Sequence, residues 1–338
     1  MERIRPTKVR IEASSACQLR CPICVTATGK IRDGAVRTGF LEAAHFRNLI
    51  DENPHVRTVE LSNYGEIFLN PELPSILRHA HEKGVRIEAT NGVNLNHAKE
   101  EALEAVVRYQ MHKLNVSIDG ATQETYAIYR VRGNLSTVLA NVKKINAYKK
   151  QYDSPYPQLY WQFILFGHNE HEVGQAQRMA EELGMTFFPK LNTTQAYSPV
   201  EDAQRVKELT RLPVVSREEY NARFHHSYPK MCYQLWLEPQ INWDGRVLGC
   251  CVNYWGEFGG NAFEDGLDTV LNSPGLRHAR KLVSGKALPT RNLPCTRCQI
   301  YWRMLRHWDW MKIEDVTSVI TEIDDYLPDG GLYARARK

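Results

Sequence analysis

Apolar residues gather in six short runs along the first 195 residues of the chain, and each run is rich in Val, Ile, Leu or aromatic side chains. Short apolar runs bounded by polar residues are typical of β-strands. The expected strands span residues 8–13, 57–61, 85–90, 113–118, 158–165 and 185–191. The pattern therefore predicts a sheet in the N-terminal part of the chain.

The segments between these runs have apolar residues at spacings of three and four, which is the pattern of amphipathic helices. The expected helices span residues 42–51, 71–83, 98–109, 136–148 and 170–183. Strands that alternate with helices favour parallel pairing through right-handed crossovers. The sequence predicts an α/β fold, a partial (β/α)6 barrel whose functional groups lie at the carboxyl ends of its strands.

The alternation of strands and helices ends near residue 195, so we expect further units beyond the barrel of residues 1–195. Residues 196–230 form the predicted linker, with one helix at 200–212. Residues 231–305 form a small cysteine-rich domain, in which 241–250 indicate a strand, a turn and a second strand. Residues 306–338 form a C-terminal aromatic and helical tail, whose aromatic side chains we expect to pack against the main body.

The composition excludes several classes of protein. Hydrophobic residues make up 43% and charged residues 24% of the 338 residues, which excludes a disordered chain. The longest stretch without a formal charge has 16 residues, fewer than the roughly 20 that a membrane-spanning helix needs. The charged N-terminus lacks the apolar region of a secretory signal, so we expect a cytoplasmic protein without membrane association. The 43 basic and 39 acidic residues are scattered, so nucleic acid is not an expected partner.

Eight cysteines suggest metal binding, because disulfide frameworks belong to short secreted chains. Cys17, Cys21 and Cys24 follow the first predicted strand at C-x3-C-x2-C spacing. Three thiolates on a four-iron cluster leave one iron without a protein ligand, so that this iron can hold a small molecule. An incomplete zinc site or a packed group of core cysteines is the alternative, although no histidine lies within several residues to complete a zinc tetrahedron.

The segment CQLRCPIC resembles the cluster-binding loop of the radical S-adenosylmethionine enzymes, and further segments match in order over most of the chain. NYGE at residues 63–66 is similar to the glycine–glutamate motif of that family. ATNG at 89–92 resembles the motif after its third strand. SIDGATQETYAIYRVRG at 117–133 is similar to the branch that has a C-terminal auxiliary-cluster domain.

This resemblance implies a binding site for S-adenosylmethionine. Glu66 would bind its amino group, and Ser117 and Arg130 would approach its carboxylate. The full set of expected cofactor-binding residues is Gly65, Glu66, Asn91, Ser117, Arg130 and, near the adenosine, Asn169. The chain departs from the family's usual pattern in having Tyr64 in place of a glycine and Ile23 in place of an aromatic residue.

The remaining cysteines resemble the short auxiliary-cluster domain called SPASM or twitch. The resemblance implies one auxiliary [4Fe–4S] cluster, whose expected ligands are Cys232, Cys250, Cys295 and Cys298. A four-cysteine zinc site has the same spacing and is the alternative. The expected cofactors are therefore two [4Fe–4S] clusters and S-adenosylmethionine.

Cys251 is the cysteine that neither cluster would use. Successive side chains of an extended segment point to opposite faces, so Cys251 is expected to face away from a cluster bound by Cys250. It is either a small buried residue or a catalytic residue that donates a hydrogen atom to a substrate radical.

The resemblance implies that a 5′-deoxyadenosyl radical removes a hydrogen atom from an unactivated C–H bond. We expect a small carbohydrate-like or aminocyclitol substrate, because only 16 residues precede Cys17, too few for the leader-binding domain of peptide-modifying members. The expected outcome is oxidation. Epimerisation with Cys251 as hydrogen-atom donor, a peptide-modifying maturase and a zinc-stapled scaffold without activity are the alternatives. A reducing partner such as flavodoxin or ferredoxin is also expected.

Overall fold

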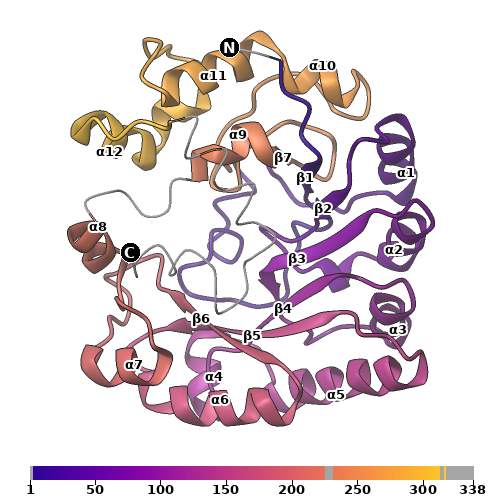
Figure 1. Cartoon of the computed structure of the whole chain (residues 1–338), viewed down its shortest axis with the longest axis vertical. Helices are drawn as coiled ribbons and strands as arrows, with labels where there is room; N and C mark the ends of the chain where they lie inside the picture. The colour runs from indigo at the N-terminus through magenta and orange to yellow at the C-terminus, as the bar shows by residue number, and fades with distance from the viewer. Residues whose placement is uncertain (1–2, 225–230, 313–315, 317–338) are drawn as a thin grey trace.

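A parallel sheet of seven strands forms the centre of the computed structural model, which describes residues 3–224, 231–312 and 316 (Figure 1). The strands lie in the order β6-β5-β4-β3-β2-β1-β7, and each neighbouring pair is parallel. Their bounds are β1 Lys8–Ile11, β2 Thr58–Glu60, β3 Arg86–Val93, β4 Lys113–Ser117, β5 Gln158–Leu165, β6 Thr186–Leu191 and β7 Gln240–Ile241. The six predicted strands are confirmed, and β6 and β7 form the two edges of this partial barrel.

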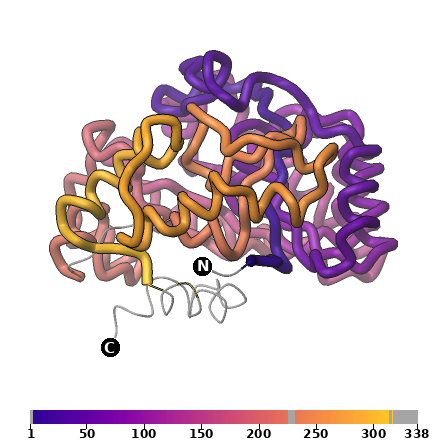
Figure 2. The backbone as a smooth tube through the Cα atoms, turned by 90° about the horizontal axis from the view of Figure 1, so that it is seen from above, coloured from indigo at the N-terminus to yellow at the C-terminus, as the bar shows by residue number. Residues whose placement is uncertain are grey.

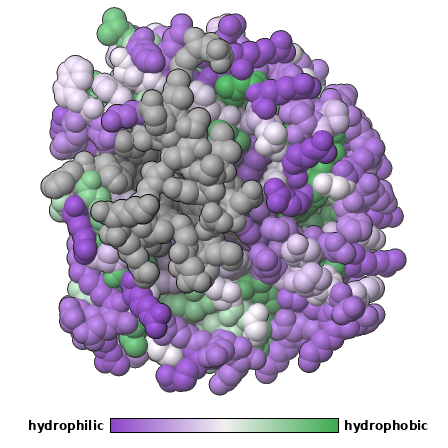
Figure 3. All heavy atoms as spheres, in the orientation of Figure 1, coloured by the Kyte–Doolittle hydropathy of each residue, from purple (hydrophilic) through white to green (hydrophobic). Residues whose placement is uncertain are grey.

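The five predicted helices of the barrel are also confirmed, and they cover the outside of the sheet (Figure 1). The sequence analysis missed one short helix, α4, in the segment that it treated only as a motif. The bounds are α1 Ala43–Glu52, α2 Leu73–Glu82, α3 Glu100–Arg108, α4 Gln123–Tyr129, α5 Leu135–Gln151 and α6 Val173–Glu182. Hydrophilic side chains cover the outer surface over α1 to α3 (Figure 3), as expected for helices with one apolar face.

The strands of the barrel have two different faces. Val9 and Ile11 of β1 are fully buried in the core beneath the helices, whereas Lys8 and Arg10 line an internal cavity. This alternation follows from the strand geometry, in which successive side chains point to opposite sides. The same alternation in β3 and β4 places Glu88, Lys113 and Ser117 in the lining of the cavity, so these strands give the lumen its polar groups while the layer between sheet and helices is apolar.

The C-terminal part begins with the predicted helix at 200–212, which is confirmed as α7 and lies beside α6, on the β6 side of the sheet (Figure 1). The later segment that contains β7 and α9 to α11 lies on the β1 side (Figure 2). Its helices are α7 Ala203–Thr210, α8 Arg217–Phe224, α9 Gln234–Leu237, α10 Leu267–Leu271, α11 Pro274–Val283 and α12 Gln299–His307. Within the described residues the short 3-10 helices are η1 Ile67–Leu69, η2 Glu170–Glu172, η3 Met231–Tyr233 and η4 Pro294–Arg297. Among the helices that the structure describes, none is both long and apolar enough to cross a lipid bilayer.

The predicted strand–turn–strand at 241–250 is only partly right. Gly245 has a φ of +86°, which suits the turn, and Ile241 and Val247 form an antiparallel bridge across it. The first strand, however, is β7, which pairs in parallel with β1, and the predicted second strand is reduced to isolated bridges. The sequence did not reveal the pairing of β7 with β1, because the two strands lie some 230 residues apart in the chain.

The prediction for the aromatic tail is also only partly right. Trp310 packs against the core, as does the buried Tyr301 of α12 just before the predicted tail, but Trp308 is 79% exposed. Apolar character alone could not show which side chains of α12 and the following turn face the core. Residues 313–315 and 317–338 of the predicted tail lie outside the described residues.

Candidate active site in the lumen of the barrel

A cavity of about 1600 Å³ occupies the lumen and opens at the carboxyl ends of the strands. It exceeds the roughly 300–1,000 Å³ of ordinary small-molecule sites, so two ligands can be accommodated together. Most of the residues selected from the sequence line this one cavity. They are Cys17, Cys21, Cys24, Gly65, Glu66, Asn91, Ser117, Arg130, Cys251 and Cys298.

The three N-terminal cysteines lie on the loop that follows β1. The Cys24 amide donates to the Cys21 carbonyl at 3.1 Å, and Arg130 Nη1 lies 3.8 Å from Cys21 Sγ. Burial raises the pKa of the Cys17 thiol to about 12, and the charge of Glu66 adds to this shift. In the described part of the chain, no three side chains of His, Cys, Asp or Glu are close enough together to hold one metal ion. Three thiols on one cavity wall do suit a cluster, which binds each thiolate through a different iron.

The loop after β2 places Glu66 in the cavity wall. The Glu12 carboxylate accepts hydrogen bonds from the amides of Tyr64, at 3.1 Å, and Gly65, at 3.3 Å. A Cβ at Gly65 would lie 2.2 Å from the Ser14 carbonyl oxygen, so this close approach requires glycine. The Glu66 carboxylate accepts from the Asn94 amide at 2.5 Å, and burial raises its pKa to about 7. Glu66 thus presents an acceptor suited to the ammonium group of an amino acid.

The ends of β3 to β5 form the opposite wall. Gln162 Nε2 donates to Ser117 Oγ and to the Asn91 carbonyl, each at 3.2 Å. Arg130 caps the end of α4, and its Nε lies 2.5 Å from Asp119 Oδ2. Asp119 therefore holds the Nε edge of the Arg130 guanidinium, and Nη1 lies toward the cysteine loop.

Asn169 does not line the cavity, although the sequence analysis placed it near the adenosine. It is fully buried, and its side chain bonds within the chain to Asp119, Ile164 and Phe166. The structure therefore gives Asn169 a role in holding the loop after β5, because its amide has no free edge for a ligand.

Four of the five C-terminal cysteines follow β7, and Cys232 precedes it on η3. Burial raises the pKa of the Cys250 thiol, and the neighbouring thiols of Cys251, Cys295 and Cys298 raise it further. The Cys298 amide donates to the Cys295 carbonyl at 3.0 Å, whereas Cys232 Sγ contacts Met304 Sδ at 3.9 Å. These thiols are the donors available to a second cluster.

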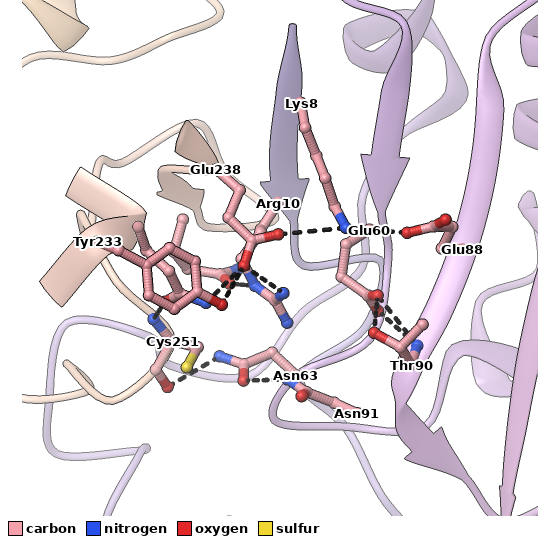
Figure 4. Close-up of polar contacts among 12 residues, drawn as sticks. Lys8, Arg10, Glu60, Asn63, Glu88, Thr90, Asn91, Tyr233, Glu238 and Cys251 are labelled. Atoms are coloured by element: carbon pink, nitrogen blue, oxygen red, sulfur yellow. Dashed lines mark hydrogen bonds and ion pairs between the residues drawn. The ribbon is translucent and has the colours of Figure 1, made fainter. Parts of the chain in front are cut away.

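Cys251 differs from its neighbour Cys250 because it lines the barrel cavity and Cys250 does not. Its amide donates to Gln234 Oε1 at 2.8 Å, and its carbonyl accepts from Asn63 Nδ2 at 3.2 Å. Figure 4 shows Cys251, from the C-terminal part, beside the residues at the ends of the barrel strands. Two domains therefore contribute thiols to one cavity.

The sequence analysis missed a charged network in the lumen (Figure 4). Lys8 Nζ lies 2.9 Å from Glu88 Oε2 and 3.3 Å from Glu238 Oε2. Arg10 Nη1 lies 3.5 Å from Glu238 Oε1, and Glu60 accepts hydrogen bonds from Thr90. The sequence contains a signal for this network, because Lys8, Arg10 and Glu88 alternate with apolar residues in the predicted strands. Only the folded sheet shows that these side chains line the same cavity.

Comparison with known proteins agrees with this geometry. Residues 11–178 match the radical SAM superfamily, and residues 232–299 match SPASM, an iron–sulfur cluster-binding domain. A curated relative is the AdoMet-dependent heme synthase of Methanosarcina barkeri, 30% identical over 54% of this chain and 49% of the relative. Another is the 7,8-dihydro-6-hydroxymethylpterin dimethyltransferase of Methanocaldococcus jannaschii, 26% identical over 60% of this chain and 38% of the relative. The chain thus spans about half or less of the length of these curated relatives.

Solved structures share the fold. Streptococcus suis SuiB bound to S-adenosylmethionine matches with a TM-score of 0.62 and 14% identity, over 88% of this chain and 71% of SuiB. The enzyme anSMEcpe with bound AdoMet and Cp18Cys peptide matches with a TM-score of 0.56 and 12% identity, over 86% of each chain. The two matched domains imply S-adenosylmethionine and [4Fe–4S] clusters as cofactors. The chain belongs to the radical SAM superfamily and has a C-terminal SPASM domain.

Proposed function

We propose that this protein is a radical SAM epimerase that removes a hydrogen atom from a small carbohydrate-like or aminocyclitol substrate and returns one from Cys251. The observation that carries the proposal is the single cavity lined by the three N-terminal cysteines and, from the other domain, by Cys251. When bound, S-adenosylmethionine and the cluster at Cys17, Cys21 and Cys24 supply a 5′-deoxyadenosyl radical.

The protein's own residues orient the reactants. Glu66 accepts hydrogen bonds from the amino group of the cofactor, and Ser117 and Arg130 bind its carboxylate. The proposed second cluster has Cys232, Cys250, Cys295 and Cys298 as ligands, next to Cys251. We also propose a cytoplasmic protein reduced by a flavodoxin or ferredoxin.

The position of Cys251 favours epimerisation over the oxidation expected from the sequence. The Cys251 S–H bond breaks and a C–H bond forms at the substrate carbon on the face opposite the one attacked. The sulfur radical that remains takes up one electron, supplied through the reducing partner, and one proton. In oxidation the substrate radical would instead lose one electron and one proton, and Cys251 would not react.

The experiment uses anaerobically reconstituted protein, for which two clusters predict about eight irons per chain. Reductant and S-adenosylmethionine should release 5′-deoxyadenosine from the wild type and from Cys251→Ala, but not from Cys17→Ala. A colourless wild-type protein, or one that releases none, contradicts the family chemistry itself.

Candidate sugars and aminocyclitols are then tested in deuterated water. Deuterium at an inverted carbon, lost in Cys251→Ala, supports epimerisation. A product that is lighter by two hydrogens and is formed equally by both proteins supports oxidation. SuiB was solved with the precursor peptide SuiA, so turnover of peptides alone would support the maturase alternative.

A further inference from the structure

Lys190, near the end of β6, differs from Lys8, Arg10 and Arg130, which line the same lumen. Lys8 and Arg10 pair with Glu88 and Glu238, and Arg130 pairs with Asp119. Lys190 lines the same cavity, but its Nζ has only Gln162 Oε1 at 3.4 Å and forms no ion pair with the described residues. A buried cation is costly unless an anion pairs with it, so a lysine of this kind at a cavity wall can bind an anionic ligand.

The surroundings of Lys190 do not supply the missing charge. The charges that shift the pKa of Lys190 most are those of Arg217 on α8, Cys251, Arg130 and Asp119. Asp119 is the only carboxylate among them, and both its oxygens are already engaged, by Arg130 Nε at 2.5 Å and by the Ile164 amide at 2.6 Å. Burial lowers the pKa of Lys190 to about 8, and the charge of Arg217 lowers it further.

The cavity as a whole is basic. Among the described residues that line it, basic side chains clearly outnumber acidic ones. The basic excess continues through the C-terminal part, where Arg211, Arg223, Arg297 and Arg303 contribute to the lining. A cavity lined by charges of one sign concentrates ligands of the opposite sign.

We propose that the substrate carries an oxyanion, a phosphate or a carboxylate, which Lys190 binds inside the cavity. This inference rests on the proposed function and narrows its substrate to an acidic or phosphorylated sugar rather than a cationic aminocyclitol. Lys190 contacts Gln162, which bonds to Ser117 on the cofactor side, and Lys190 interacts electrostatically with Cys251. An anion at Lys190 therefore anchors the substrate between the cofactor and the thiol.

The test is calorimetric titration of the anaerobic holoprotein near pH 8.5, with sulfate and acetate as probes for phosphate and carboxylate. Saturating S-adenosylmethionine occupies the carboxylate site of Ser117 and Arg130. Two buffers with different ionisation enthalpies measure proton exchange. Saturable binding with proton uptake is expected, because an anion raises the pKa of a neighbouring lysine. The probe that binds more tightly identifies the class of oxyanion.

Three variants make the test specific. Lys190→Gln should weaken binding at least tenfold and abolish proton uptake, and Lys190→Arg should bind without proton uptake, because arginine stays charged. Lys30→Gln removes a charge from a more exposed cavity lysine and should behave as wild type. Absent binding in the wild type, unchanged binding in Lys190→Gln, or equal loss in Lys30→Gln overturns the inference. Release of 5′-deoxyadenosine, measured in parallel, reports on the proposed function separately.

Discussion

Single glycines decide how closely the walls of the cavity approach each other. Gly92 lies near the end of β3 with a φ of +109°. A Cβ at this position would lie 2.2 Å from Ser117 Oγ and 2.6 Å from Gln162 Nε2, two side chains of the cavity wall that the ends of β3 to β5 form. Gly84 also has a positive φ, +66°, but nothing lies within 4 Å of the position of its Cβ. A substitution at Gly84 therefore causes backbone strain alone, whereas one at Gly92 causes backbone strain and steric overlap.

We predict that Gly92→Ala destabilises the protein by about 2–4 kcal/mol, because overlap adds to the backbone strain. Gly84→Ala should cost only about 1 kcal/mol, from strain alone. Urea unfolding measures both free energies. Release of 5′-deoxyadenosine should fall in Gly92→Ala and stay at the wild-type level in Gly84→Ala. Equal losses in the two variants would show that Ser117 and Gln162 yield to the new methyl group.

At the scale of elements, buried charges connect strands that are not neighbours. Glu88 on β3 lies 2.9 Å from Lys8 on β1 and 3.6 Å from His112, which precedes β4. Burial opposes the charge of Glu88, but His112, Lys8 and Lys113 together hold its pKa well below the ordinary value of 4.5. Glu88 therefore contributes stability above pH 4.5, and that contribution is lost as the pH falls toward the lower folded-state pKa.

We predict that Glu88→Gln lowers the free energy of unfolding at pH 7 by about 3–5 kcal/mol, because it leaves Lys8 without one of its two carboxylates. Below pH 4.5 the difference from the wild type should begin to shrink, because the unfolded wild type takes up a proton at Glu88 that the folded protein does not yet bind. Urea unfolding at pH 7 and at pH 4 gives the comparison. Glu100→Gln, which breaks an exposed pair with Lys144, is the control and should change little. A difference that is independent of pH would refute this account of Glu88.

At the scale of the whole molecule, Glu238 joins the C-terminal part to the barrel. It is 3% exposed and pairs with both Lys8 and Arg10 of β1. The backbone adds two hydrogen bonds, from the Arg10 amide to the Pro239 carbonyl and from the Glu12 amide to the Ile241 carbonyl. This joint fixes the position of β7 and places Cys251 at the cavity.

We predict that Glu238→Gln weakens this joint by about 3–5 kcal/mol, because it leaves part of the charge of Lys8 and Arg10 uncompensated. Hydrogen exchange of the Arg10 and Glu12 amides should accelerate, while the amides of β5 keep their protection. Glu257→Gln, in the same C-terminal part but with a half-exposed carboxylate, is the matched control. Unchanged exchange in Glu238→Gln would mean that the backbone bonds alone hold the domains together.

The sequence determined the elements and the chemistry that depend on local order. Six strands and their helices follow from apolar periodicity, because each element must bury one face whatever its neighbours are. The C-x3-C-x2-C loop was recognisable because cluster ligands lie within eight residues of one another. The prediction that Glu66, Ser117 and Arg130 bind the cofactor came from the resemblance to a family and not from their spacing. All three line the same cavity, which agrees with that prediction.

Only the tertiary structure decided what depends on contacts between distant residues. The pairing of β7 with β1, the ion pairs of Glu238 and the entry of Cys251 into the barrel join residues more than 180 positions apart. The structure also shows that Asn169 bonds to the Asp119 carbonyl of its own chain. The sequence does not show whether the amide of a polar loop residue binds a ligand or another part of the chain. Lys190 likewise looks like an ordinary charged residue in the sequence, and only the folded structure shows that it forms no ion pair with the described residues. Electrostatic pairing depends on distance in space, and sequence order alone does not give that distance before the chain has folded.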